Sequence, residues 1–305
     1  MDLGTLLSMV GKLGQYGSTM FRYKGLPLPI IVDTKLMEKV ENFATRSDDV
    51  FIVGFPKSGT TWLQIALSMM YSNWGTCKRS KKGRVPVLDI PSLPGVEGHD
   101  KCVKASSPRL MKSHLPFDYF PKQAKHDDLS KKCKVIYVAR NPKDSCVSLF
   151  HMLRGYHFLQ TDDSWDHFIT DFIEGEVIYG SWFQHVTGWL ENSDKVDMLY
   201  ITYEQMKLDF PSVLHMVANF LDKPVSDETI EKVSEACGFQ ELRRHGKDKV
   251  VIPKVFYDSK KSPFFRKGIV GDWKNHFTEK QSQEFDEKVE AQLREKGIHF
   301  VYELD

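Results

Sequence analysis

The sequence has few cysteines, almost no excess charge of either sign and no long apolar run. Its five cysteines, an odd number, include no Cys-x-x-Cys pair, which argues against a disulfide framework and a cysteine zinc site. Lysine and arginine total 42 against 41 acidic residues, so the surface is not built mainly to neutralise nucleic acid or anionic lipid. The longest apolar runs, 26–32 and 50–55, are far shorter than the ~20 residues of a membrane-spanning helix. We therefore expect no nucleic-acid partner and no membrane anchor.

A secretory signal, internal repeats and an interdomain linker are also missing from the sequence. No basic region follows Met1-Asp2, and the apolar stretch before Lys12 is very short, so we expect a cytoplasmic protein. No Gly/Ser-rich or Pro-rich stretch is long enough to separate two units. The composition, 41% hydrophobic and 27% charged, is that of a globular protein. The sequence predicts a single domain over residues 1–305.

Apolar patterning indicates alternating strands and helices. Short runs rich in β-branched and aromatic residues predict buried strands of a parallel sheet over 50–55, 134–139 and 198–203. Helical periodicity is found over 36–44, 165–190 with breaks at Gly175 and Gly180, 210–221 and 278–297. This alternation predicts an α/β fold with a central, mostly parallel sheet flanked by helices. Segments 77–115 and 238–271 have little regular pattern, so we expect them to be functional loops.

A glycine-containing loop follows the first predicted strand directly. It reads Gly54-Phe-Pro-Lys-Ser-Gly-Thr-Thr-Trp62 and leads into a helix-compatible segment. A strand, a glycine loop and a helix in this order aim backbone N–H groups at an anion. Thr60 stands where a nucleotide triphosphatase has lysine, and the lysine lies inside the loop as Lys57. The loop therefore indicates a phosphate-like ligand with an ammonium group at the transferred or leaving atom; a plain surface turn is the alternative.

Two further cationic segments are candidates for the same site. Arg140 ends the second predicted strand, and Ser148 follows about two helical turns later, so both can reach one anion near the carboxyl ends of the strands. The intervening Asn-Pro-x-Asp is also a common helix start. A third segment, Ser262-Pro-Phe-Phe-Arg-Lys-Gly268, is either an exposed basic turn or part of the site, if it folds back over the other two segments.

A lysine and a histidine lie two residues apart, as Lys112 and His114. In an extended segment this spacing places both side chains on one face. A neutral imidazole beside a cation suits the removal of a proton from an acceptor hydroxyl, with the cation stabilising the charge that develops. We therefore predict that His114 is a general base.

Together these motifs resemble the ordered signature set of the cytosolic sulfotransferases. The resemblance runs from about Lys24 to the C-terminus and includes Tyr137–Asp144, Tyr203–Lys207, Arg266–Trp273 and, away from the chemistry, Gly175–Trp182. It implies transfer of a sulfuryl group from 3'-phosphoadenosine 5'-phosphosulfate (PAPS) to a hydroxyl or amine of a small lipophilic acceptor such as a phenol or steroid. The transfer implied by this resemblance would require no metal. The alternatives are a protein that binds PAPS or a lipophilic ligand without turnover, and a phosphate-loop kinase that uses ATP.

The resemblance also assigns roles by position. The 5'-phosphosulfate would be held by Lys57, Ser58, Gly59, Thr60 and Thr61, and the 3'-phosphate by Arg140, Ser148, Arg266, Lys267 and Gly268. The adenine would contact Trp62, Tyr203 and Phe239. The catalytic residues would be His114, Lys57, Lys112 and Ser148.

Two parts of the resemblance are less complete. The acceptor pocket would be lined by Val87, Ile90, Phe150, Tyr156 and Phe256. Asp89 could meet an amine, but we expect it to be an exposed loop charge. A homodimer is possible, but the dimer motif of the family departs at Glu279 and Gln283, where a valine and a glutamate are usual, so that mode of dimerisation is in doubt.

Overall fold

The computed structural model describes residues 20–73, 85–92, 96–126, 128, 132–157, 164–245 and 257–304. The strands are β1 (Met20–Tyr23), β2 (Leu26–Pro29), β3 (Val50–Val53), β4 (Leu110–Ser113), β5 (Lys134–Ala139) and β6 (Asp197–Thr202). The longer helices are α2 (Thr34–Glu41), α3 (Thr60–Asn73), α5 (Pro142–Leu153), α6 (Trp165–Glu174), α7 (Trp182–Glu191), α9 (Phe210–Phe220) and α10 (Asp227–Ala236). Shorter ones are α4 (His99–Lys104), α8 (Tyr203–Leu208), α11 (Phe239–His245), α12 (Glu279–Phe285) and α13 (Ala291–Glu295).

Four strands form one parallel sheet in the order β4-β3-β5-β6. The three predicted strands are confirmed as β3, β5 and β6, although β3 ends at Val53. The fourth strand, β4, lies in the segment that we expected to be irregular. Its four residues, Leu-Met-Lys-Ser, pair with β3 and are all buried. The sheet, with helices around it, confirms the predicted α/β class.

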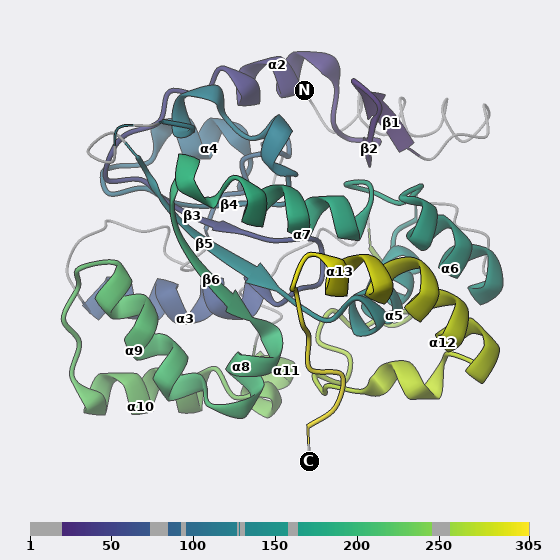
Figure 1. Ribbon diagram of the computed structural model, residues 1–305. Coiled ribbons are helices and arrows are strands. Elements are labelled where there is room, and N and C mark those ends of the chain that lie inside the picture. Colours follow the sequence, from purple (N-terminus) through teal and green to yellow (C-terminus); the bar gives the residue numbers. More distant parts are fainter. Residues whose placement is uncertain are drawn as a thin grey trace.

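Alternation along the strands gives the sheet two apolar faces. Phe51, Val53 and Tyr137 belong to one core cluster, which also contains side chains of α5, α6 and α7. Ile52 and Ile136 belong to the other, with α3, α9 and α10. Successive side chains of a strand point to opposite faces, so short continuous apolar runs fill both. Figure 1 shows α7 on one side of the sheet and α3, α9 and α10 on the other.

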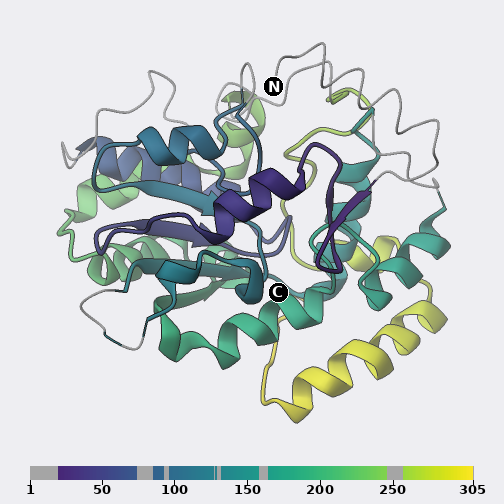
Figure 2. The same cartoon turned by 90° about the horizontal axis from the view of Figure 1, so that it is seen from above.

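The predicted helices are also confirmed in their places. The segment 165–190 is two helices, because α6 ends at its left-handed cap, Gly175, and α7 begins after Ser181. The last predicted helix begins after Thr278, whose capping box with Gln281 is formed, and a π-helical turn joins α12 to α13. Figure 2 shows α12 and α13 along one side of the molecule. Among the residues that the structure describes, no helix is long and apolar enough to cross a membrane.

Candidate active site

The carboxyl ends of the four parallel strands bring the predicted site segments to one edge of the sheet. Residues 54–59, which we call the phosphate loop, follow β3, and His114 follows β4. Arg140 follows β5, and Tyr203 follows β6. In open α/β sheets this edge is where ligands bind. Segments up to 150 residues apart in the sequence therefore share one region of the fold.

The phosphate loop is tightly packed against the sheet. A Cβ at Gly54 would collide with the carbonyl oxygen of Val138 on β5, so the position requires glycine. Lys57 has a positive φ of 74°, in the left-handed region, and is half-buried. Ser58 is fully buried, and its Oγ has no hydrogen-bond partner among the described residues. A buried hydroxyl without a partner is costly, which indicates that the loop is shaped for a ligand that would satisfy it.

Two lysine ammonium groups lie in this region. Lys112 Nζ donates a hydrogen bond to Thr61 Oγ1 at 3.3 Å, and Lys57 Nζ lies 4.2 Å from the centre of the Phe264 ring. Burial, together with the charges of Arg140, Lys112 and Arg266, lowers the pKa of Lys57 to about 7. Burial lowers the pKa of Lys112 to about 8, although the charge of Asp89 opposes this. Burial is the main cause of both shifts, and the crowding of cations around Lys57 adds to its own, as in a site made for an anion.

His114 is held in one tautomer by the phosphate loop. Its Nδ1 lies 2.7 Å from the carbonyl oxygen of Gly54. A carbonyl can only accept, so Nδ1 carries the proton and Nε2 keeps its lone pair. Burial, and the charges of Lys112 and Lys57, lower the pKa of His114 to about 3. The imidazole is therefore neutral at pH 7, as a proton acceptor must be.

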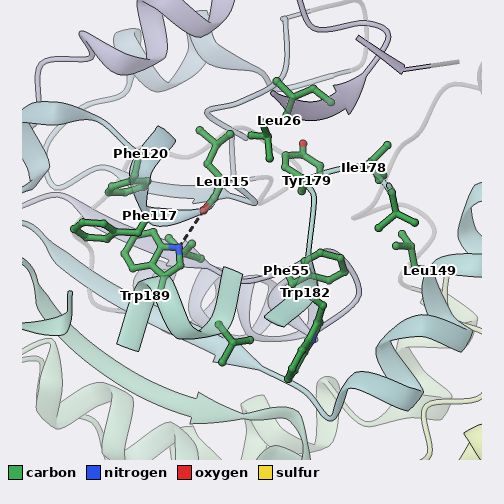
Figure 3. Packing of buried hydrophobic residues seen from close by; sticks show 14 of the residues in the cluster. Leu26, Phe55, Leu115, Phe117, Phe120, Leu149, Ile178, Tyr179, Trp182 and Trp189 are labelled. Atoms are coloured by element: carbon green, nitrogen blue, oxygen red, sulfur yellow. Dashed lines mark hydrogen bonds between the residues drawn. The ribbon is translucent and has the colours of Figure 1, made fainter. Parts of the chain in front are cut away.

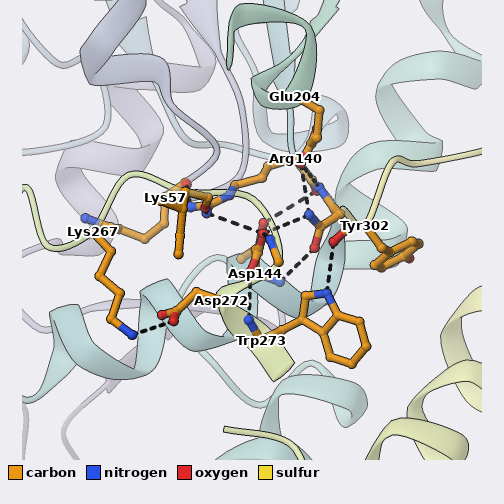
Figure 4. Close-up of polar contacts among 12 residues, drawn as sticks. Lys57, Arg140, Asp144, Glu204, Lys267, Asp272, Trp273 and Tyr302 are labelled. Carbon is orange, nitrogen blue, oxygen red and sulfur yellow. Dashed lines mark hydrogen bonds and ion pairs between the residues drawn. The ribbon is translucent and has the colours of Figure 1, made fainter. Parts of the chain in front are cut away.

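Arg140 joins the phosphate loop to the segment 266–271. Its guanidinium group donates to the carbonyl oxygens of Lys57 at 3.4 Å and Ile269 at 3.1 Å, and lies 4.2 Å from the centre of the Tyr203 ring. Its buried Nε has no partner among the described residues. Asp144 Oδ2 accepts the N–H of Gly271 at 2.9 Å, and Asp144 Oδ1 accepts that of Trp273 at 3.0 Å; Figure 4 shows Asp144 beside Trp273. The basic segment 262–268 thus folds back over the other two segments and is not an isolated turn.

The two cations of that segment converge on one buried carboxylate. Lys267 Nζ lies 2.5 Å from Asp272 Oδ1, and Arg266 is paired with Asp272 Oδ2. Although burial opposes it, these bonds lower the pKa of Asp272 to about 2. Asp272 therefore fixes the positions of Arg266 and Lys267, a role that nothing in the sequence indicated.

The aromatic candidates lie around the same region. The Trp62 ring is 5.7 Å from Tyr203 and 4.5 Å from Phe210, measured between ring centroids. Phe239 begins α11, and its ring covers Gly268 so closely that a Cβ there would collide with it. Ser148 lies on α5 and is half-buried, between buried neighbours on both sides.

The candidate pocket residues are distributed over several elements. Val87 forms a parallel bridge with Lys112, and Ile90 is half-buried nearby in the chain. Phe150 is buried against Trp165 and Phe168. Tyr156 pairs with Tyr257. Phe256 lies outside the described residues.

Two expectations about neighbouring residues were wrong. Asp89 is fully buried and not an exposed loop charge, because it accepts the N–H of His114 and the hydroxyl of Tyr179. The Gly175–Trp182 motif is not away from the chemistry, because the Tyr179 ring lies 5.6 Å from the His114 ring. Both contacts join segments far apart in the sequence, so no local pattern could indicate them.

Comparisons with known proteins agree with this arrangement. A family model, the sulfotransferase domain, matches residues 47–297. Sulfotransferase 1E1 of Bos taurus is 37% identical over 266 residues, which cover 86% of this chain and 88% of that protein. Amine sulfotransferase of Oryctolagus cuniculus is 34% identical over 289 residues, 90% of each chain. The crystal structure of mouse sulfotransferase SULT7A1 complexed with PAP has a TM-score of 0.76 and 30% identity, and covers 91% of this chain and 96% of that one.

The fold and the site thus define an α/β protein with a phosphate loop and a cluster of cations at the carboxyl edge of its sheet. This chain belongs to the sulfotransferase family, and it is an enzyme of that class.

Proposed function

We propose that the protein transfers a sulfuryl group from PAPS to a hydroxyl or amine of a small lipophilic acceptor. The observation that carries this proposal is the neutral His114 imidazole, with Nε2 unprotonated, beside the ammonium groups of Lys57 and Lys112. A protein that only bound the donor would need no proton acceptor next to two cations. An ATP-dependent kinase is disfavoured because the lysine lies inside the loop and Thr60 takes the usual lysine position.

The unsatisfied groups of the site fit the two anionic ends of PAPS. At the phosphate loop, Ser58 Oγ and the backbone of Gly59, Thr60 and Thr61 would hold the 5'-phosphosulfate, because they surround the start of α3. The 3'-phosphate would be held by Arg140, Ser148, Arg266, Lys267 and Gly268. Arg140 Nε is the buried donor left over for it. Trp62, Tyr203 and Phe239 would contact the adenine, as base-stacking aromatic side chains do.

The chain's own groups supply the chemistry around the transferred sulfuryl group. His114 Nε2 takes the proton from the acceptor hydroxyl or amine. The Lys57 ammonium neutralises the charge that develops on the bridging oxygen of the leaving phosphate, and Lys112 stabilises the sulfuryl oxygens in an in-line displacement. Ser148, half-buried on α5, completes the proposed catalytic set.

Donor binding would also make His114 a stronger base. The positive charges of Lys112 and Lys57 contribute to its low pKa. An anionic ligand between these ammonium groups offsets their charges, so the pKa of His114 rises toward its ordinary value. The imidazole would then accept a proton most readily when the donor is in place.

The acceptor and the assembly state stay predictions. Val87, Ile90, Phe150, Tyr156 and Phe256 are the proposed pocket residues, a lining suited to an apolar ring. Glu279 and Gln283 are exposed on α12. A charged side chain therefore stands where the family's dimer motif has a valine, and an uncharged amide stands where it has a glutamate. We propose that the chain does not dimerise through that motif, that it works in the cytoplasm as one domain over 1–305, and that it requires no metal.

The test is product formation from PAPS with a panel of acceptors: simple phenols, catechols, a hydroxysteroid, an aliphatic alcohol and an amine. ATP in place of PAPS is the control for the donor. We expect sulfated product with PAPS alone, and a loss of ~10²-fold or more in kcat for His114→Ala with an unactivated alcohol, because a positioned base contributes about that much. Full turnover by His114→Ala would refute the base assignment. Phosphorylated product from ATP would refute the donor.

A further inference from the structure

A buried carboxylate reaches the backbone of His114 from a neighbouring extended segment. Residues 86–88 run parallel to β4, because Lys112 N donates to Pro86 O at 2.9 Å and Leu88 N donates to Lys112 O at 2.8 Å. Val87 is bridged to Lys112, so two residues further along each segment Asp89 comes level with His114. Asp89 is fully buried, and its Oδ1 accepts the His114 N–H at 3.1 Å.

Tyr179 holds the other oxygen of the same carboxylate. Its hydroxyl donates to Asp89 Oδ2 at 2.6 Å. Tyr179 has a φ of 67°, in the left-handed region that bulky residues rarely adopt, and its N–H donates to Pro27 O at 2.7 Å. Figure 3 shows its side chain in the core, close to Ile178 and Leu26. A strained backbone that persists next to a catalytic histidine points to a functional constraint on the direction of this side chain.

The carbonyl of His114 is held as well. His185 Nε2 lies 3.0 Å from His114 O, and His185 Nδ1 lies 2.8 Å from the hydroxyl of Tyr137. Since a carbonyl only accepts, His185 carries its proton on Nε2 and accepts the Tyr137 hydroxyl hydrogen at Nδ1. The N–H of His114 therefore bonds Asp89, its carbonyl oxygen bonds His185, and its ring bonds Gly54. Of these three partners, Asp89 is the one that can carry a charge beside Lys112.

We propose that Asp89, held by Tyr179, is a positioning residue for His114 and also supplies the negative charge that faces Lys112. This inference rests on the proposed function, because it assigns to the pair a part in the transfer reaction. Asp89 acts through the His114 backbone and through the field at Lys112. Both of its carboxylate oxygens are bonded to protein groups, the His114 N–H and the Tyr179 hydroxyl.

The groups that face Asp89 determine what its removal should do. They are Lys112, the hydroxyl of Ser113, the backbone N–H of His114, Tyr179 and, in α4, Cys102. Tyr179 and Cys102 stay uncharged near neutral pH, because burial raises the pKa of both. Burial raises the pKa of Asp89, and the hydrogen bonds that its carboxylate accepts from the Tyr179 and Ser113 hydroxyls, the His114 N–H and its own N–H act in the opposite direction.

Lys112 is therefore the cation whose titration should respond to Asp89. The Asp89 charge raises the pKa of Lys112 against the larger effect of burial. Without that charge the pKa of Lys112 falls further. The ammonium is then lost at a lower pH, and the basic limb of the rate profile moves in the same direction.

The experiment measures kcat and KM from pH 6 to 10 for the full-length enzyme and four variants. Asp89→Asn keeps the shape and an oxygen acceptor but removes the charge, whereas Tyr179→Phe removes only one hydrogen bond. Asp89→Glu keeps a carboxylate at this position. Asp286→Asn is the control for the loss of a carboxylate elsewhere, because Asp286 forms an ion pair with Lys143 of α5. We expect Asp89→Asn to lower kcat by about tenfold and to move the basic limb down by on the order of one pH unit, with KM for PAPS unchanged at pH 6, where Lys112 keeps its proton.

The other variants separate positioning from charge. Tyr179→Phe should lower kcat several-fold without moving the basic limb of the pH profile. Asp89→Glu, which keeps the charge, should have its basic limb at the wild-type position. Asp286→Asn should behave as wild type. An unmoved limb in Asp89→Asn would overturn the charge role, and an unchanged kcat in both Asp89→Asn and Tyr179→Phe would overturn the positioning role.

A second readout needs neither donor nor acceptor. Hydrogen–deuterium exchange of the segment 110–116 should be faster in Asp89→Ala than in wild type, because the His114 amide loses its acceptor. Equal exchange would overturn the positioning role even if the wild-type enzyme formed no product. Absence of wild-type product together with faster exchange would count against the proposed function and leave the positioning intact.

Discussion

The affinity for PAP, the nucleotide that PAPS becomes when it loses its sulfuryl group, should fall steeply as the pH rises above 7. The reason lies in Lys57, whose pKa is lowered to about 7 by burial and by the charges of Arg140, Lys112 and Arg266. An anion at the phosphate loop stabilises the ammonium form, so the pKa of Lys57 is higher in the complex than in the free protein. Above pH 7 binding must therefore take up a proton, and the affinity present below the free pKa is lost as the pH rises through it.

The magnitude follows from the two lysine values. A free pKa of about 7 leaves half of Lys57 protonated at pH 7 and about 1% at pH 9, so the Kd rises about 50-fold from this group. Lys112, with a free pKa of about 8, contributes about a further tenfold over the same interval. The phosphate groups of PAP are already almost fully ionised at pH 7, so they add little to the pH dependence of the Kd.

Calorimetric titration of PAP at pH 7, 8 and 9 measures this dependence. Lys57→Arg is the matched control, because guanidinium stays charged over the whole range and only the Lys112 contribution should remain. A Kd that is constant from pH 7 to 9 in the wild type would refute the argument. Equal slopes in wild type and Lys57→Arg would show that the dependence comes from another group.

Two further substitutions test the neighbouring structure. Gly268→Ala should weaken PAP binding about tenfold in calorimetry, because the new Cβ displaces the Phe239 ring and the position has a left-handed φ of 68°. Unchanged affinity would show that Phe239 does not contribute to nucleotide binding. Arg109→Ala should destabilise the fold by about 3–5 kcal/mol in urea unfolding, because the fully buried Asp49 carboxylate loses its ion pair. A loss below about 1 kcal/mol would show that Asp49 finds another partner or becomes protonated.

Local patterns in the sequence predicted the parts of the fold that depend on local physics. Strands buried on both faces need continuous apolar runs, which made β3, β5 and β6 visible, and capping residues such as Thr278 mark helix starts. The strand β4 was missed because it is four residues long and contains Lys112 and Ser113, which are buried by pairing with β3 and not by apolar character.

The candidate site divides in the same way. The phosphate loop and the Lys112–His114 pair are local, so residue types and spacing were enough to indicate them. The contacts of Asp89 with His114 and Tyr179 span 25 and 90 residues, and they depend on the parallel course of 86–88 beside β4. Arg266 and Lys267 were recognisable as cations, but their common partner Asp272 emerged only from the folded chain.

In the proposed reaction His114 is the proton acceptor in sulfuryl transfer from PAPS. The most direct test measures single-turnover sulfation of one phenol whose pKa is lowered in steps by ring substituents, with wild type and His114→Ala side by side. The deficit of His114→Ala should be ~10²-fold or more for the least acidic phenol and should shrink as the acceptor becomes ionised without help. A deficit that stays constant across the series, or no deficit at all, would contradict this role of His114.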